Sequence, residues 1–245
     1  MSMSNLGNEM ISLTQFSKVT LVAALAFGSV PATAFSEEQA AVTDGRAAAV
    51  ENFEAGDPAL MLGGQVDLVN QTPPWLVSIS GGKLFMENKL EPLSLHYNDI
   101  GWVQFPGTDV LASTDGAVVS ATVDVKNMGK GGAGIFVGSG KAGTYLFFSV
   151  DGQGQYHVLR KDGRSLRALR SAKHVAIHAG APNELAFELR GANVVFFANG
   201  TEIIKVPNEN GMASAGRGND QAGVGLAAFG IGVFSFDDVE IVRPD

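Results

Sequence analysis

The sequence contains no cysteine, which excludes disulfide bonds, thiolate metal sites and cysteine nucleophiles. Basic residues are also scarce: 17 Lys and Arg stand against 25 Asp and Glu, and the formal net charge is -8. Proteins that bind nucleic acid neutralise phosphates with a basic surface, so this balance argues against a nucleic-acid partner. The 45% of hydrophobic residues are nevertheless enough to form a core, which excludes a disordered chain.

No apolar run reaches the roughly 20 residues that a bilayer-spanning helix needs, so no transmembrane anchor is expected. The longest run, Val19 to Val30, follows Lys18 and ends at the small-residue pattern Ala32-Thr33-Ala34. A short apolar run before an A-x-A pattern is typical of a signal peptide, here residues 1–34 with the cut before Phe35. The sequence therefore predicts export to the periplasm or the cell exterior. The alternative is a buried first helix, and Met10 could equally be the start.

The rest of the chain shows no internal repeat and no linker that would divide it. Residues 35–49 are polar and alanine-rich, and we interpret them as a spacer. We expect one folded domain over residues 50–245.

The apolar residues of this domain recur with a period of two, which indicates strands. Val119, Ala121, Val123 and Val125 alternate with polar residues, and Leu185 to Leu189 repeats the pattern. No amphipathic helix is evident, and 31 glycines suggest many tight turns. Short strands at intervals of about 8 to 12 residues predict an all-β sandwich or jelly roll. Further strands are expected at Gly134–Val137, Tyr145–Val150, Gln155–Lys161, Leu166–Leu169, Val175–Ala179, Ala222–Ala228 and Val233–Val242.

Asn199-Gly200 is the strongest hairpin signal in the chain, because a type I′ turn needs positive φ at both central positions. A two-residue loop here would place Phe196 opposite Ile203 and Val195 opposite Ile204.

Six segments together resemble the concanavalin A-like lectin/glucanase superfamily, in particular its laminin-G-like and 3-keto-disaccharide hydrolase domains. They are GTYLFFSVDG at 143–152, QYHVLR at 155–160, NELAFELRG at 183–191, FFANG at 196–200, GVGL at 223–226 and FDDVEI at 236–241. Glu51 to Glu54, Trp75 and Gly82-Lys83-Leu84 match the usual opening. The resemblance covers about residues 50 to 243 and implies a jelly-roll sandwich of two antiparallel sheets. The resemblance is weak evidence for function, because one fold hosts many functions.

The catalytic patterns of this superfamily are missing. Retaining glycosidases of this fold carry an E-x-D-x-E or E-x-D-x-x-E strand that places two carboxylates about 5 to 5.5 Å apart, and no such triplet occurs. The lyase-like match, Arg164 to Arg170 followed by Ala176-Ile177-His178, lacks the lyase glutamine, tyrosine and third motif. We therefore expect a lectin-like module that binds carbohydrate or a cell-envelope glycan without catalysis. The alternatives are a glycan-active enzyme resembling the keto-disaccharide hydrolases, and an adhesion or scaffold module for a protein partner.

Sugars are bound by aromatic faces and planar polar groups. Eight residues supply these types on expected strands or adjoining loops, and Tyr156 and Arg160 should share one strand face while His157 takes the other. The candidate ligand-binding residues are Trp102, His96, Tyr97, Asp99, Tyr145, Tyr156, His157 and Arg160.

No cofactor is required by this interpretation, but a structural Ca²⁺ is possible. Carboxylates occur near the first and last strands, which usually lie together in such sandwiches, and Ca²⁺ takes 6 to 8 oxygen ligands. The candidate ligands are Glu51, Glu54, Asp237 and Asp238. A basic stretch from Arg160 to Lys173 holds six of the 17 cationic residues. It is either a solvated face or a patch for an acidic glycan or partner.

Overall fold

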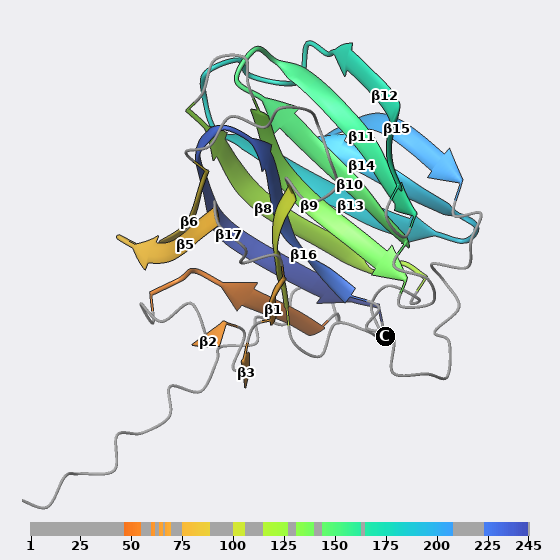
Figure 1. Ribbon diagram of the computed structural model, residues 1–245. Coiled ribbons are helices and arrows are strands. Elements are labelled where there is room, and N and C mark those ends of the chain that lie inside the picture. The colour runs from red at the N-terminus through yellow and green to blue at the C-terminus, as the bar shows by residue number, and fades with distance from the viewer. Residues whose placement is uncertain are drawn as a thin grey trace, which may run out of the picture. The chain divides into compact units, whose positions relative to one another are not determined.

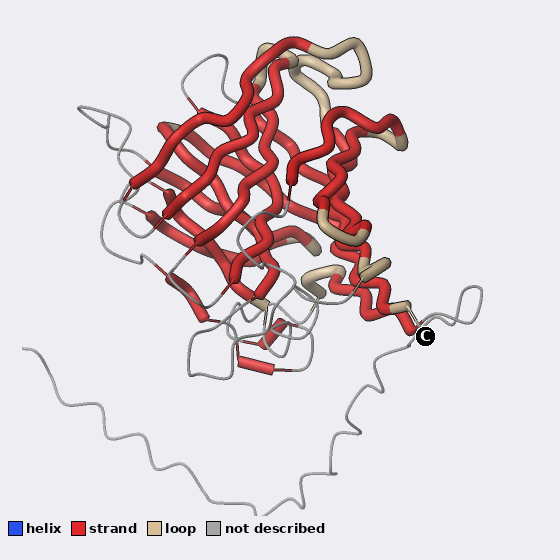
Figure 2. Tube along the Cα trace, turned by 90° about the vertical axis from the view of Figure 1, so that its right-hand side faces the viewer, coloured by secondary structure: helices blue, strands red, loops and turns tan. Residues whose placement is uncertain are grey.

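The computed structural model describes residues 47–54, 60–61, 64–65, 67–69, 75–88, 100–105, 115–126, 131–139, 144–162, 165–207 and 223–244. Within them every regular element is a β-strand, and Figure 2 shows strands and loops alone. The signal peptide predicted over residues 1–34 lies outside the described residues. A helix long and apolar enough to cross a bilayer does not occur in the described part of the chain.

The described strands form two large antiparallel sheets (Figure 1). The seven-stranded sheet has the order β12 (Ser165–Lys173), β11 (Gln155–Asp162), β10 (Thr144–Asp151), β9 (Gly131–Ser139), β16 (Gly223–Gly230), β7 (Ile100–Gln104) and β4 (Asp67–Val69). The eight-stranded sheet has the order β15 (Thr201–Pro207), β14 (Asn193–Ala198), β13 (Asn183–Arg190), β8 (Val118–Val125), β17 (Gly232–Arg243), β6 (Lys83–Asn88) and β5 (Trp75–Ser80). In addition, β1 (Ala47–Glu51) pairs with β17. A small pair joins β2 (Leu60–Met61) to β3 (Gly64–Gln65). The predicted sandwich of two antiparallel sheets is confirmed.

The core lies between the two sheets and is built by the predicted period of two. On β8, Val119, Ala121 and Val123 are fully buried, whereas the polar residues between them are half-buried. Across the core, the ring of Phe148 on β10 stacks on that of Phe196 on β14 at 4.9 Å between centroids. Seven phenylalanines belong to this core and supply much of the volume that joins the sheets: Phe53, Phe105, Phe148, Phe187, Phe196, Phe234 and Phe236.

The first and last described strands lie side by side, as expected for this fold. β1 pairs antiparallel with β17, with Val50 opposite Glu240. The pairing begins at Ala47, so the sheet includes three residues of the segment 35–49 that the sequence interpretation assigned to a spacer.

The Asn199-Gly200 hairpin is confirmed, with φ angles of 50° and 75°. Its register differs from the predicted one. Phe197 lies opposite Glu202, but a bulge then shifts the ladder, so Phe196 lies opposite Ile204. The predicted pairing of Phe196 with Ile203 is wrong because Ile203 is the extra residue of a β-bulge, which turn chemistry alone does not reveal.

The strand predicted at Val175–Ala179 is also wrong, because this segment forms turns. Two buried or half-buried asparagines hold its backbone. Asn183 accepts from His178 N at 2.7 Å and donates to His178 O at 3.0 Å, and Asn199 donates to Ala176 O at 2.6 Å. These side chains replace ladder hydrogen bonds, so the segment stays out of the sheet, and Val175 is 97% exposed.

Replacing Gly200 with Val should lower the free energy of unfolding by more than about 1 kcal/mol, because a β-branched residue is forced to positive φ. No atom lies within 4 Å of an added Cβ, so the effect reports backbone strain alone. Urea unfolding measures it, with Thr201→Val, an exposed strand position, as the control expected within about 0.5 kcal/mol of wild type. Equal midpoints for the two variants would contradict the turn assignment.

Candidate functional site

The outer face of the seven-stranded sheet is the side that points away from the core. Leu146 and Phe148 on β10 belong to the core, so the alternating residues Phe147 and Ser149 lie on the outer face. The strand pairing shows which residues of the neighbouring strands lie on the same face. One row, from β7 to β12, contains Trp102, Ala227, Gly134, Ser149, His157 and Ser171.

A second apolar cluster covers this face. We call it the outer aromatic layer: buried Ile100, Trp102, Phe136, Phe147, Leu159 and Ala227, with partly buried Tyr145, Leu166 and Phe229. The Trp102 ring stacks on Phe147 at 5.6 Å and lies 4.6 Å from Tyr145. Trp102 is only 6% exposed, and its Nε1 has no hydrogen-bond acceptor among the described residues. Ring packing therefore holds the indole in place, and its face is not open to a ligand.

Glycines on the two central strands allow these rings to meet. Trp102 and Tyr145 start on strands separated by β16 and β9. A Cβ at Gly138 would collide with the Tyr145 ring, and one at Gly225 would lie 2.7 Å from Phe136. The sequence interpretation assigned the glycines to tight turns. Those of β9 and β16 serve close packing instead.

Lys161 places a cation against the outer aromatic layer. Its Nζ lies 5.2 Å from the Trp102 ring and 5.0 Å from the Tyr145 ring, within cation–π range. The residue is 9% exposed, and burial lowers the pKa of its ammonium group below the ordinary value.

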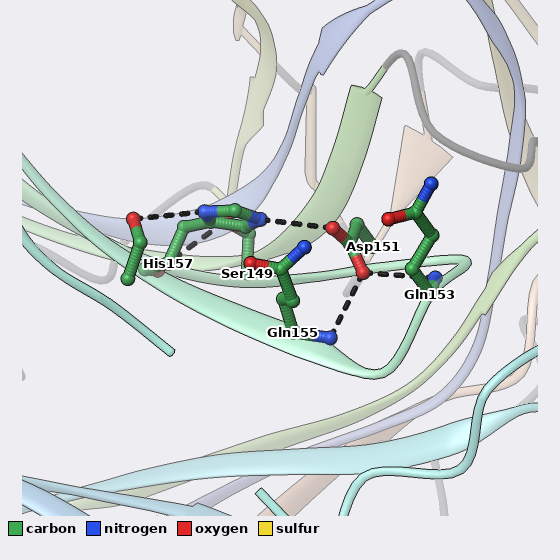
Figure 3. Close-up of polar contacts among 6 residues, drawn as sticks. Ser149, Asp151, Gln153, Gln155 and His157 are labelled. Atoms are coloured by element: carbon green, nitrogen blue, oxygen red, sulfur yellow. Dashed lines mark hydrogen bonds and ion pairs between the residues drawn. The ribbon is translucent and has the colours of Figure 1, made fainter. Parts of the chain in front are cut away.

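A hydrogen-bonded chain crosses the outer face beside the aromatic layer (Figure 3). Asp151 accepts from the backbone N–H groups of Gln153 and Gln155, each at 2.9 Å, which fixes its carboxylate at the β10–β11 turn. The His157 ring contacts Asp151 Oδ2 through Nε2 at 3.3 Å and Ser171 Oγ through Nδ1 at 3.0 Å. Three strands are thereby joined through one imidazole.

The same three side chains, Ser171, His157 and Asp151, also match an arrangement used in nucleophilic catalysis. In the tautomer protonated at Nε2, His157 donates a hydrogen bond to Asp151, and its Nδ1 accepts a hydrogen bond from the Ser171 hydroxyl. This is the order of a nucleophile, a base and an orienting carboxylate. His157 is also held by Phe229, whose ring meets it edge-on at 5.6 Å.

Comparison with known proteins gives a clear result for the fold alone. No family model and no curated protein matches the chain. Among solved structures, a Bacillus licheniformis β-glucanase matches with a TM-score of 0.52 and 9% identity over 81% of this chain and 98% of that one. Porphyranase B from Zobellia galactanivorans matches with a TM-score of 0.50 and 11% identity, over 79% of this chain and 90% of that one. A structure from work on endo-acting O-glycanases of the human gut microbiota matches with a TM-score of 0.52 and 14% identity, over 80% of this chain and 98% of that one.

The chain has the concanavalin A-like jelly-roll fold. The resemblance derived from sequence motifs is thereby confirmed at the level of the fold. Identities of 9 to 14% show nothing about the site residues.

The eight predicted ligand-binding residues divide into three groups. Trp102, Tyr145 and His157 lie on the outer face, although Trp102 is buried. Tyr156 and Arg160 lie on the opposite face of β11. His96, Tyr97 and Asp99 lie outside the described residues.

The predicted role of Tyr156 as a sugar platform is wrong for a structural reason. The residue is 5% exposed, belongs to the core and lies 6.3 Å from the Phe148 ring, so a sugar cannot reach it. Arg160 on the same face is 9% exposed, and its Nε donates to both carboxylate oxygens of Asp162 at 2.9 Å. The expectation of opposite faces was right, but the open side is that of His157.

The four carboxylates proposed for calcium do not come together. Among the described residues, no three His, Asp or Glu side chains converge on a possible metal position. Glu51 accepts from Phe53 N at 2.6 Å, and Asp238 accepts from Thr122 Oγ1 at 3.3 Å, while Glu54 is exposed. Asp237 pairs with Lys83 at 2.9 Å, and this bond raises the pKa of Lys83. Calcium binding itself stays a prediction.

Carboxylates are scarce on the outer face. Of the described side chains of β7, β9, β10, β11 and β16, Asp151 is the one carboxylate that it presents. Retaining glycosidases need two carboxylates about 5 to 5.5 Å apart. The described part of the face does not provide that pair.

Sequence reasoning missed Lys161, Phe229, Asp151 and Ser171 as members of this face. The signal was present in part: Tyr145, Phe147 and Ser149 alternate with core residues along β10, which indicates one shared face. The contact of Ser171 with His157 depends on the register of β11 and β12, which contains a bulge between Val158 and Leu159.

Stability should depend on Lys161 at alkaline pH. Because burial lowers its folded-state pKa, the unfolded chain binds more protons between that pKa and the ordinary value of 10.5. Stability therefore rises with pH across this window. Urea midpoints measured from pH 8 to 11 should rise less in Lys161→Met than in wild type. Parallel pH profiles would contradict the assigned burial.

Proposed function

We propose that this protein is an exported glycan-binding module that does not alter the glycan it binds. The observation that carries the proposal is the partly exposed rim of the outer aromatic layer. Tyr145, His157 and Phe229 keep exposed ring surface there, beside the Lys161 ammonium and the Ser171 hydroxyl. Ring faces with nearby polar groups are the combination that sugars require.

The scarcity of described carboxylates supports binding over glycosidase chemistry, and the matched structures support a glycan as the ligand. The face lacks a second described carboxylate, as stated above, and Asp151 already accepts two backbone hydrogen bonds and contacts His157. The three matched structures described above are named as a β-glucanase, a porphyranase and a structure from work on O-glycanases, so the fold accommodates glycans in other proteins. A protein partner at the same face is the competing outcome.

Binding is tested by screening the purified protein on a glycan array and measuring affinities for the best ligand. Tyr145→Ala should weaken binding about tenfold, or about 1.4 kcal/mol, through loss of a stacking ring. The matched control is Phe197→Ala, a half-buried aromatic of the eight-stranded sheet that lies under Arg190. Thermal melting must show both variants folded. Equal losses in both, or no glycan bound at all, would contradict the proposal.

A separate experiment tests whether the protein alters the glycan that it binds. The bound glycan, and its O-acetylated form, should be recovered unchanged after prolonged incubation, as judged by mass spectrometry. Ser171→Ala is the diagnostic variant, because among the described residues Ser171 carries the hydroxyl that contacts the His157 ring. Product release that disappears in Ser171→Ala would replace this proposal with an esterase. Release that persists would indicate a glycosidase.

Export rests on Lys18, the apolar run and Ala32-Thr33-Ala34. Amino-terminal sequencing of the protein recovered from the periplasm or medium of producing cells should begin at or near Phe35. Recovery of the uncut chain from the cytoplasm would contradict it.

A further inference from the structure

β12 is the last strand of the seven-stranded sheet, and it carries a line of exposed cations. Within the described residues it pairs with β11 on one side and with no strand on the other (Figure 1). Arg167, Arg170 and Lys173 are exposed, and the strand contains no Asp or Glu. The chain as a whole has 25 acidic and 17 basic residues, so this strand departs from the average.

These cations are hardly neutralised by described neighbours. Arg167 lies 3.9 Å from Asp162, whose two oxygens already accept from Arg160. Among the described carboxylates, none forms an ion pair with Arg170 or Lys173. Charged side chains, Lys above all, also keep an edge strand from pairing with another sheet, so the charges by themselves do not identify a ligand. The pocket at the end of this line and the adjoining aromatic rim are the further observations that point to an anionic ligand.

The spacing of the cations suits an extended ligand. At about 3.3 Å per residue, three positions along a strand separate neighbouring charges by about 10 Å. Lys173 lies opposite Gln155 on the outer face, whereas Arg170 lies opposite Val158 on the other face. The charges therefore follow the free edge of β12 from both sides, and a chain lying along that edge can reach all of them.

The line of cations along β12 ends at an open pocket. The pocket has a volume of about 300 Å³ and is lined by residues that include Gln153, Lys173, His174 and Val175. Its amide, ammonium and imidazole groups can all donate hydrogen bonds to a carboxylate or sulfate. The side chain of Val175, which is 97% exposed, adds apolar surface. A pocket of this size lies at the lower end of the range for small-ligand sites.

We propose that the free edge of β12, together with this pocket, binds an acidic polysaccharide through its carboxylate or sulfate groups. The inference rests on the proposed function and names its ligand class. The edge is continuous with the rim of the aromatic layer, because Ser171 of β12 hydrogen-bonds His157. Sugar rings would contact the rim while their anionic groups meet Arg170 and Lys173. The net charge of -8 acts against both kinds of polyanion, so the choice of an acidic glycan over a nucleic acid rests on the adjoining rim, which the proposed function assigns to sugars.

The test measures binding of polygalacturonate, heparin and a neutral β-glucan by the purified protein at two salt concentrations. Arg170→Gln/Lys173→Gln should weaken binding of the best acidic glycan about tenfold at low salt and reduce its salt dependence. The matched control is Lys126→Gln/Lys205→Gln, which removes two exposed charges from other surfaces. It should change the affinity less than about threefold.

The outcomes separate the two proposals. Equal loss in both double variants would overturn the β12 site, because it would show a response to net charge alone. Binding of the neutral glucan but of neither polyanion would overturn the β12 site and leave the proposed function standing. Failure to bind any glycan would overturn both. A single-stranded oligonucleotide that binds the same edge more tightly than either polyanion would replace the acidic glycan with a nucleic acid.

Discussion

The alternation of side chains along β9 and β16 is the constraint on which both the core and the outer aromatic layer depend. Their inward residues, such as Ile135 and Leu226, are fully buried in the core. Most of their outward positions are Gly or Ala, which removes side-chain volume from the middle of the outer face. Rings from the flanking strands fill this space, so Trp102 reaches Tyr145. A larger residue at Gly138 would separate the rings by steric collision.

This arrangement explains why the outer face is apolar without being an open hydrophobic patch. The largest rings pack against each other, and among the described residues solvent reaches the partly buried Tyr145, Leu166 and Phe229 and the adjoining His157. Lys161 contributes its apolar stem and places its ammonium group beside two ring faces. The result is a surface with aromatic edges and, among the described side chains of its central strands, one carboxylate, Asp151.

Side-chain hydrogen bonds position the parts of this region that lie outside the ladders. Asp151 shapes the β10–β11 turn and holds His157, and His157 in turn contacts Ser171 on the edge strand. Asn183 and Asn199, which contact each other at 2.9 Å, hold the turns before β13. The pocket beside Lys173 lies between these two anchored turns, so its walls are fixed by buried polar contacts.

The sequence alone determined the sandwich, because period-two patterns and Asn199-Gly200 are local signals that act within a few residues. It also indicated that Tyr156 and His157 take opposite faces. Only the tertiary structure decided which face is the core, since both faces of β11 carry apolar and polar residues. The bulges at Ile203 and between Val158 and Leu159 shift the register, and they depend on contacts between strands. The meeting of Trp102 with Tyr145 and of His157 with Ser171 follows from that register, which no single segment of the chain encodes.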